Sequence, residues 1–151
     1  MKSLRVTKHQ PQDPKLPSVY VTYLVGIKSW VLADTYKVTL RLDDRESIEV
    51  EIPEGFEFDL ASIPRPIWPL IGSFELSLVA PLIHDYFYQY AGQPVYHRRT
   101  LDGIFVPDGE WHDVSRVEAD QIFLSLMLRE GVTSWKAHAA YRAVRLFAPR
   151  W

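Results

Sequence analysis

The chain has 151 residues, of which 47% are hydrophobic and 13% aromatic, so it can bury the core of one domain. Its 17 basic and 19 acidic residues give a formal net charge of −2, a balance that argues against a dedicated nucleic-acid binder. It contains no cysteine, which excludes disulfides, thiolate metal sites and a cysteine nucleophile.

The start of the chain predicts neither secretion nor membrane insertion. Residues 1–5 lack the apolar stretch of a signal peptide, and no run approaches the roughly 20 apolar residues of a transmembrane segment. We therefore expect synthesis in the cytoplasm. Residues 1–18 are polar and hold three prolines, which predicts a loosely ordered arm before a single domain of residues 19–151.

Hydrophobic residues alternate between Val19 and Ile52, a pattern that predicts antiparallel strands. The runs 37–42 and 47–52 flank an Asp-Asp-Arg-Glu turn and predict a hairpin, and residues 30–32 predict another strand. Prolines and glycines then recur from Pro53 to Gly72, which predicts a long loop without regular structure.

Helical periodicity begins near Phe74, and Pro81 either kinks this helix or marks its first turn. A second hairpin is expected within residues 93–112, turning at Asp102-Gly103 or at Asp108-Gly109.

Two further helices are predicted in the last third of the chain. Ser115 and Glu118 have the spacing of a capping box, and Gly131 marks the end of that helix. Thr133 or Ser134 begins the next helix. Its apolar stripe consists of Ala137, Ala140, Tyr141, Val144 and Phe147. Strands followed by helices predict an α+β fold, with a small antiparallel sheet packed against about three helices.

His84 and Asp85 are adjacent polar residues with apolar neighbours on both sides of their helix. Buried groups of this kind need partners, and one interpretation is that they hold loops by hydrogen bonds. Asp120 shares the inward stripe of a second helix with Val117, Leu124 and Met127, which makes His84 its candidate partner. A histidine held by a buried aspartate is suited to act as a general base, whereas an aspartate that caps backbone amides is the alternative.

The proline-rich loop adds candidate contacts. Asp59 either accepts nearby amides in an Asx turn or lies beside His84 as a metal ligand or substrate contact. Ser62, Trp68 and Tyr86 are the candidate pocket residues, although no nucleophile elbow surrounds Ser62. The pairs Arg98-Arg99 and Arg142/Arg145 are interpreted as solvated surface.

Three segments together carry a resemblance. Gly55–Pro64 reads G-F-E-F-D-L-A-S-I-P, residues 84–88 read H-D-Y-F-Y, and residues 119–123 read A-D-Q-I-F. This combination resembles a family of uncharacterised proteins common in bacteriophages and prophages, with Phe58 in place of the usual threonine. The resemblance implies a phage or prophage origin.

The helix with H-D-x-x-Y and the distant aspartate also resemble part of the phospholipases of the A-two type. That likeness implies His84 as the base, Asp85 as a calcium ligand, and Asp120 as the group that orients His84 with help from Tyr88. The loop of residues 59–64 would supply the remaining oxygen ligands for a divalent cation, with calcium favoured.

Two hypotheses follow from the sequence. The leading one is a small phage hydrolase in which His84 and Asp120 activate water, with Asp85 and Asp59 as metal ligands and a lipid or cell-envelope substrate. The competing one is a non-enzymatic virion component, such as a tail, tail-tip or assembly protein, incorporated in the particle with other virion proteins as partners.

Overall fold

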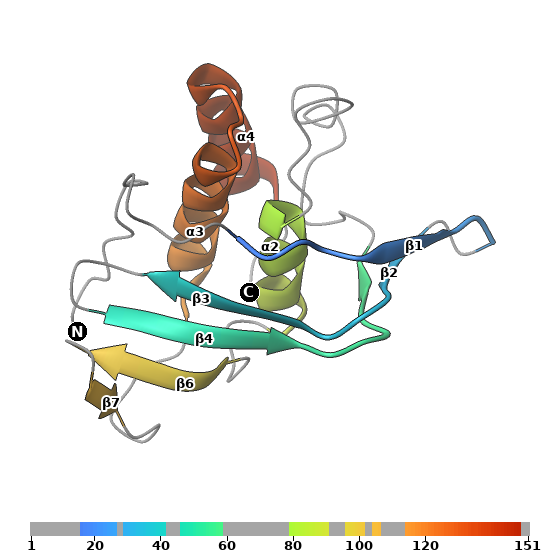
Figure 1. Cartoon of the computed structure of the whole chain (residues 1–151). Coiled ribbons are helices and arrows are strands. Elements are labelled where there is room, and N and C mark those ends of the chain that lie inside the picture. Colours follow the sequence, from blue (N-terminus) through green and yellow to red (C-terminus); the bar gives the residue numbers. More distant parts are fainter. Residues whose placement is uncertain are drawn as a thin grey trace.

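A computed structural model describes residues 16–26, 29–41, 46–58, 79–90, 96–101, 104–106 and 114–148. These residues form two small antiparallel sheets and three helices, which confirms the α+β prediction (Figure 1). Of the expected arm, residues 16–18 are described: Leu16 packs against the core, and the Tyr36 hydroxyl donates to the Pro17 carbonyl at 3.0 Å. In the described residues, no helix is long and apolar enough to cross a membrane.

The larger sheet has the strand order β3-β4-β6-β7. Its strands are β3 (Tyr36–Arg41), β4 (Glu46–Ile52), β6 (Tyr96–Leu101) and β7 (Ile104–Val106). The antiparallel pairing of β3 with β4 confirms the first predicted hairpin. Leu101 pairs with Ile104, so the second hairpin crosses Asp102-Gly103, one of the two predicted turns.

The smaller sheet has the order β1-β2-β5. It consists of β1 (Val21–Leu24), β2 (Ser29–Leu32) and β5 (Glu57–Phe58). The predicted strand at residues 30–32 is therefore confirmed. The expectation of no regular structure after Pro53 is wrong at β5. There Phe58 pairs with Trp30 of β2, and the Phe58 ring is buried.

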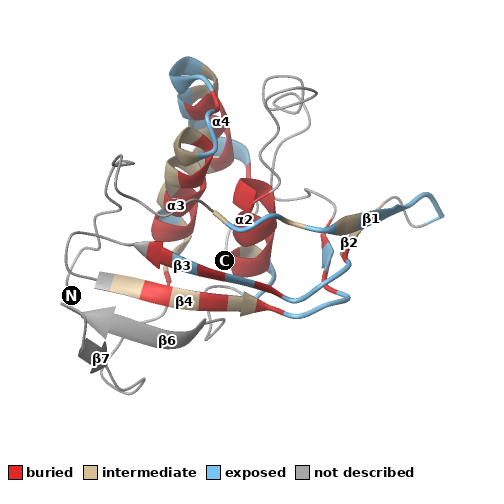
Figure 2. Ribbon diagram, in the orientation of Figure 1, coloured by how far each residue is buried: buried red, intermediate tan, exposed pale blue. Residues whose placement is uncertain are grey.

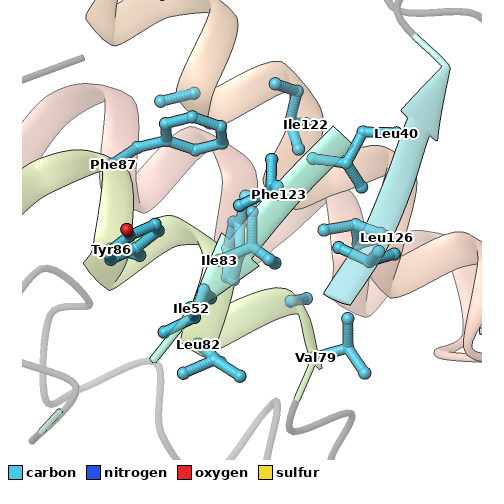
Figure 3. Close-up of a cluster of buried hydrophobic side chains, with 14 of the residues drawn as sticks. Leu40, Ile52, Val79, Leu82, Ile83, Tyr86, Phe87, Ile122, Phe123 and Leu126 are labelled. Carbon is cyan, nitrogen blue, oxygen red and sulfur yellow. The ribbon is translucent and has the colours of Figure 1, made fainter. Parts of the chain in front are cut away.

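Helix α2 (Val79–Gln89) is the centre of the core, since its residues from Val79 to Phe87 are all buried. Pro81 lies in its first turn, where the missing N–H costs no intrahelical bond, and this confirms the second of the two alternatives. Figure 3 shows Ile83 of α2 and Phe123 in one cluster with Leu40 of β3 and Ile52 of β4.

Helices α3 (Arg116–Arg129) and α4 (Ser134–Phe147) complete the helical layer. The capping box is confirmed, because the Ser115 side chain accepts from the Glu118 N–H and the Glu118 carboxylate accepts from the Ser115 N–H. After α3, Gly131 has a φ of +91°, a left-handed conformation that glycine adopts at little cost. Thr133 is the N-cap of α4, although its side chain does not make the capping hydrogen bond to the first turn.

The predicted apolar stripe of α4 is correct for its three smaller members and wrong at its end. Ala137, Ala140 and Val144 are buried, whereas Phe147 is 74% exposed. Phe147 is the last residue of α4, and α3 begins beside this end with the polar Arg116, which binds the carbonyls of α4. Periodicity tells which way a side chain faces, but it does not tell whether a neighbouring element reaches it.

Candidate active site

Three helices bring their polar side chains together around Asp120. This aspartate lies on α3 among Ala119, Phe123 and Met127, which are all fully buried, and its own side chain is 0% exposed. The predicted inward stripe is thus correct at Met127 and wrong at Val117, which is 43% exposed. An isolated carboxylate in such a place would cost several kcal/mol or more, so donors must surround it. They come from both neighbouring helices.

The Asp120 carboxylate accepts three short hydrogen bonds. Its Oδ1 lies 2.7 Å from His84 Nε2 and 2.6 Å from the Tyr88 hydroxyl, while its Oδ2 lies 2.7 Å from Arg145 Nη1. His84 and Tyr88 are four residues apart on α2, so they lie one above the other on the same helix face. The network therefore joins α2, α3 and α4 through one carboxylate.

The donors keep Asp120 ionised. Burial alone would raise its pKa, but the hydrogen bonds from His84, Tyr88 and Arg145 outweigh burial and hold the pKa below its ordinary value. Burial, followed by the bond to Asp120 and its negative charge, raises the pKa of Tyr88 well above its usual range. Tyr88 is therefore a neutral donor, and Arg145 supplies the positive charge that balances the carboxylate.

An ionised carboxylate only accepts, so His84 must donate to it from Nε2. In the neutral imidazole this tautomer leaves the lone pair on Nδ1. The ring is also held from its sides: its centroid lies 4.2 Å from that of Tyr88 and 4.7 Å from that of Phe123. Contacts from α2 and α3 thus set both the tautomer and the ring plane of His84.

Arg145 corrects the sequence interpretation. We interpreted the Arg142/Arg145 pair as solvated surface, and Arg142 is exposed, but Arg145 is only partly exposed and binds Asp120. The sequence indicated the role of Arg145 only indirectly. A carboxylate on the buried stripe of α3 needs a cation, and Arg145 is the neighbour of Val144 in the apolar stripe of α4. Sequence alone could not show that this end of α4 lies beside Asp120.

Arg116 is a second arginine whose place the sequence did not indicate. Its Nη2 donates to the carbonyls of Val144, Arg145 and Ala148 at 3.1, 3.1 and 3.2 Å. A cation at a helix C-terminus stabilises the partial negative charge of the last carbonyls. Arg116 therefore holds the turn of α4 that presents Arg145 to Asp120.

The other candidate residues are distributed as follows. Asp85 is buried next to His84 on α2. Tyr86 turns toward β4 instead of Asp120: its hydroxyl donates to the Glu51 carbonyl at 3.3 Å, and its ring meets Phe56 edge-on. Asp59, Ser62 and Trp68 lie outside the described residues.

Metal ligation by the Asp120 carboxylate would compete with its three donors. Among the residues that the structure describes, no group of three His, Asp or Glu side chains is positioned to hold a metal ion. The divalent cation thus stays a prediction that depends on Asp59 and the loop around it.

Residues 30–144 match the model of a family described as "Protein of unknown function (DUF1353)". The chain belongs to this family. His84, Tyr88 and Asp120 lie inside the DUF1353 match, and Arg145 follows its last residue.

A relative is the "Uncharacterized protein y4jT" of Sinorhizobium fredii, which is 35% identical over 111 residues, or 72% of this chain. The aligned segment spans only 27% of the length of y4jT. No solved structure gives a significant match.

Proposed function

We propose that this protein is a small hydrolase in which His84 activates water and Asp120 orients His84. The observation that carries the proposal is the 2.7 Å contact between His84 Nε2 and an ionised, fully buried carboxylate. A histidine whose tautomer is set by an aspartate is a recurring general base in hydrolysis.

In the proposed reaction, Nδ1 of His84 takes a proton from water as the water oxygen attacks the carbonyl carbon of an ester. The imidazolium that forms is stabilised by the Asp120 carboxylate beside it. When the ester C–O bond breaks, the same proton passes from Nδ1 to the leaving alkoxide, which restores the neutral imidazole. Tyr88 and Arg145 hold Asp120 in place throughout and do not exchange protons.

The substrate class, a lipid or cell-envelope ester, and the phage or prophage origin rest on the resemblances of the sequence signature. In this proposal the protein is made in the host cytoplasm and is carried in the virion if its substrate is the envelope. A divalent cation, with calcium favoured, would bind at Asp85 and Asp59 and would polarise the ester carbonyl.

The test uses His84→Gln, because the glutamine amide can still donate to Asp120 but has no titratable base. We expect hydrolysis of p-nitrophenyl butyrate and of phosphatidylcholine vesicles, assayed with and without calcium, to fall at least about 10³-fold. The free energy of unfolding should change by less than about 1.5 kcal/mol, since the donor is kept. His138→Gln, at an exposed histidine of α4, is the matched control and should keep full activity.

A second candidate function is a non-enzymatic virion component, and one observation favours it. The side chains of His84 and Asp120 are both 0% exposed, as expected of a latch that joins three helices. In that case the wild-type protein hydrolyses neither substrate, purified particles contain it, and phage carrying His84→Gln remain as infective as wild type. If the wild type hydrolyses either substrate and His84→Gln does not, the protein is the proposed hydrolase.

A further inference from the structure

The outer strand of the smaller sheet, β1, exposes apolar side chains. β1 is the terminal strand in the order β1-β2-β5, so within the described part of the chain only β2 pairs with it. Figure 2 shows the β1–β2 hairpin extending away from the helices, with β1 largely exposed and β2 partly buried. The exposed apolar residues are Tyr20 (62%), Tyr23 (46%), Leu24 (42%) and Val25 (77%).

The pairing pattern shows which backbone groups of β1 point outward. The Ala33 N–H donates to the Tyr20 carbonyl at 2.8 Å, and hydrogen-bonded pairs alternate with non-bonded pairs along an antiparallel ladder. Thr22–Val31 is then a bonded pair, whereas Val21–Leu32 and Tyr23–Trp30 are not. The polar backbone groups of Val21 and Tyr23 therefore point away from β2.

Leu32 supports this assignment independently. Its N–H donates to the Phe56 carbonyl at 2.9 Å, and its carbonyl accepts from the Gly55 N–H at 2.8 Å. Both of its backbone groups are thus turned toward the β5 side and away from Val21. The close approach of the Tyr23 and Trp30 rings, at 4.9 Å between centroids, is also typical of a non-bonded pair.

This edge lacks the usual protection. Natural edge strands commonly carry charged residues that prevent pairing with other chains, yet residues 16–26 contain no charged residue. By contrast β3, which ends the larger sheet, carries Lys37 and Arg41. A strand without charge can lie beside an identical strand without like-charge repulsion.

We propose that β1 pairs antiparallel with β1 of a second copy of this chain, about a twofold axis at Thr22. Val21 of each copy then exchanges backbone hydrogen bonds with Tyr23 of the other, which uses all the outward groups identified above. Such a contact is isologous and closes at two copies. The inference is independent of the proposed hydrolase.

The side chains of the strand are self-complementary in this register. Tyr23 faces Val21 of the second copy, an aromatic and β-branched pair of a kind that stabilises sheets, and Thr22 faces its own equivalent. Tyr20 faces Leu24 of the second copy. Each exposed apolar side chain of β1 therefore gains an apolar neighbour, and the two small sheets join into one.

A cysteine variant tests the register directly, because the wild-type chain has no cysteine. Thr22→Cys places two thiols opposite each other at the axis, so mild oxidation should yield a disulfide-linked dimer. Thr39→Cys, also exposed but on the charged edge strand β3, is the matched control. We expect Thr22→Cys to cross-link at least tenfold faster than Thr39→Cys at equal concentration, measured on non-reducing gels.

The wild-type protein provides the second measurement. Light scattering after size-exclusion chromatography should give twice the 17.5 kDa of one chain, and Tyr23→Pro, which removes an outward N–H, should raise the dimer dissociation constant at least tenfold. A wild-type mass of one chain at 100 μM would overturn the proposal, as would equal cross-linking of the two cysteine variants. Binding of monomers to phosphatidylglycerol vesicles through this hairpin, without dimers, would also overturn it.

Discussion

The helical layer and the β1–β2 hairpin place their polar and apolar groups in opposite ways. Around Asp120, charged and polar side chains are buried or partly buried, and every one of the three short bonds has a donor from another helix. On β1, apolar side chains are exposed and the backbone groups of Val21 and Tyr23 point outward. In the first arrangement, the stability of the helical layer depends on a few buried polar contacts. In the second, the outward backbone groups and exposed apolar side chains of β1 are positioned to contact another chain.

This difference predicts how the two regions respond to substitution. A change in the helical layer should alter the free energy of unfolding and the geometry of His84 together, because the hydrogen bonds of Asp120 determine both. A change on β1 should alter association and leave the single chain almost as stable as before. The predictions below test this separation, from the largest effect on stability to the smallest.

The largest loss is expected for Asp120→Ala. It removes the acceptor of three hydrogen bonds and leaves Arg145 with a charge that no longer has its partner, so the free energy of unfolding should fall by about 3–5 kcal/mol. Urea unfolding followed by circular dichroism measures the change. Within the same network Tyr88→Phe removes a single hydrogen bond to a charged group and should cost about 1.5–3 kcal/mol.

The exposed Glu54, which lies between β4 and β5, supplies a control. Glu54→Ala removes a carboxylate without a buried partner network and should change the free energy of unfolding by at most about 0.5 kcal/mol. If Asp120→Ala were as mild as Glu54→Ala, the network would not support the helical layer. Asp120 would then neither join the three helices nor orient His84.

The contribution of Asp120 should depend on pH in a defined direction. Its pKa is lower in the folded protein than the value of about 3.9 expected in the unfolded chain, so it stabilises the folded state fully above that value. As the pH falls through the folded pKa, this stabilisation is lost. The difference in unfolding free energy between wild type and Asp120→Asn should therefore be greatest above about pH 5 and should shrink below about pH 4.

Urea unfolding of both proteins between pH 7 and pH 3 measures that difference. The Asn variant does not titrate at this position, so the loss of the Asp120 contribution below about pH 4 appears in the difference between the two proteins. A difference that stays constant to pH 3, or grows as the pH falls, would contradict the assignment of an ionised Asp120 held by three donors.

The smallest effect on stability is expected on β1. Tyr23→Lys places a charge on a half-exposed side chain and removes its ring contact with Trp30, so the unfolding free energy of the monomer, measured at low protein concentration, should fall by about 0.5–1.5 kcal/mol. The same variant should abolish the dimer, because two lysines would be brought close to one axis. Trp135→Lys, which changes an exposed aromatic on α4 in the same way, should leave the dimer intact.

Several elements could be predicted because their signals are local. The capping box of Ser115 and Glu118 and the stop at Gly131 depend on backbone groups within a few residues. The hairpin of β3 and β4 follows from alternation on both sides of a polar turn. The two-residue strand β5 was missed because it exists only through its pairing with β2, far away in the sequence.

The candidate site divides in the same way. His84, Tyr88 and Asp120 were recognisable because polar residues on apolar helix faces need buried partners, and the structure joins all three. Arg145 and Arg116 were not, since long basic side chains at helix ends are usually solvated. Their bonds depend on how α3 and α4 cross.

The sequence by itself determined the order of the helices and of the longer strands, and the presence of a buried polar pair on facing helices, because periodicity and capping act over a few residues. Only the tertiary structure decided that Arg145 balances the charge of Asp120, that Phe147 is exposed, and that β1 is the terminal strand of its sheet in the described part of the chain. These facts depend on which elements become neighbours, and that choice is made by packing of the whole core.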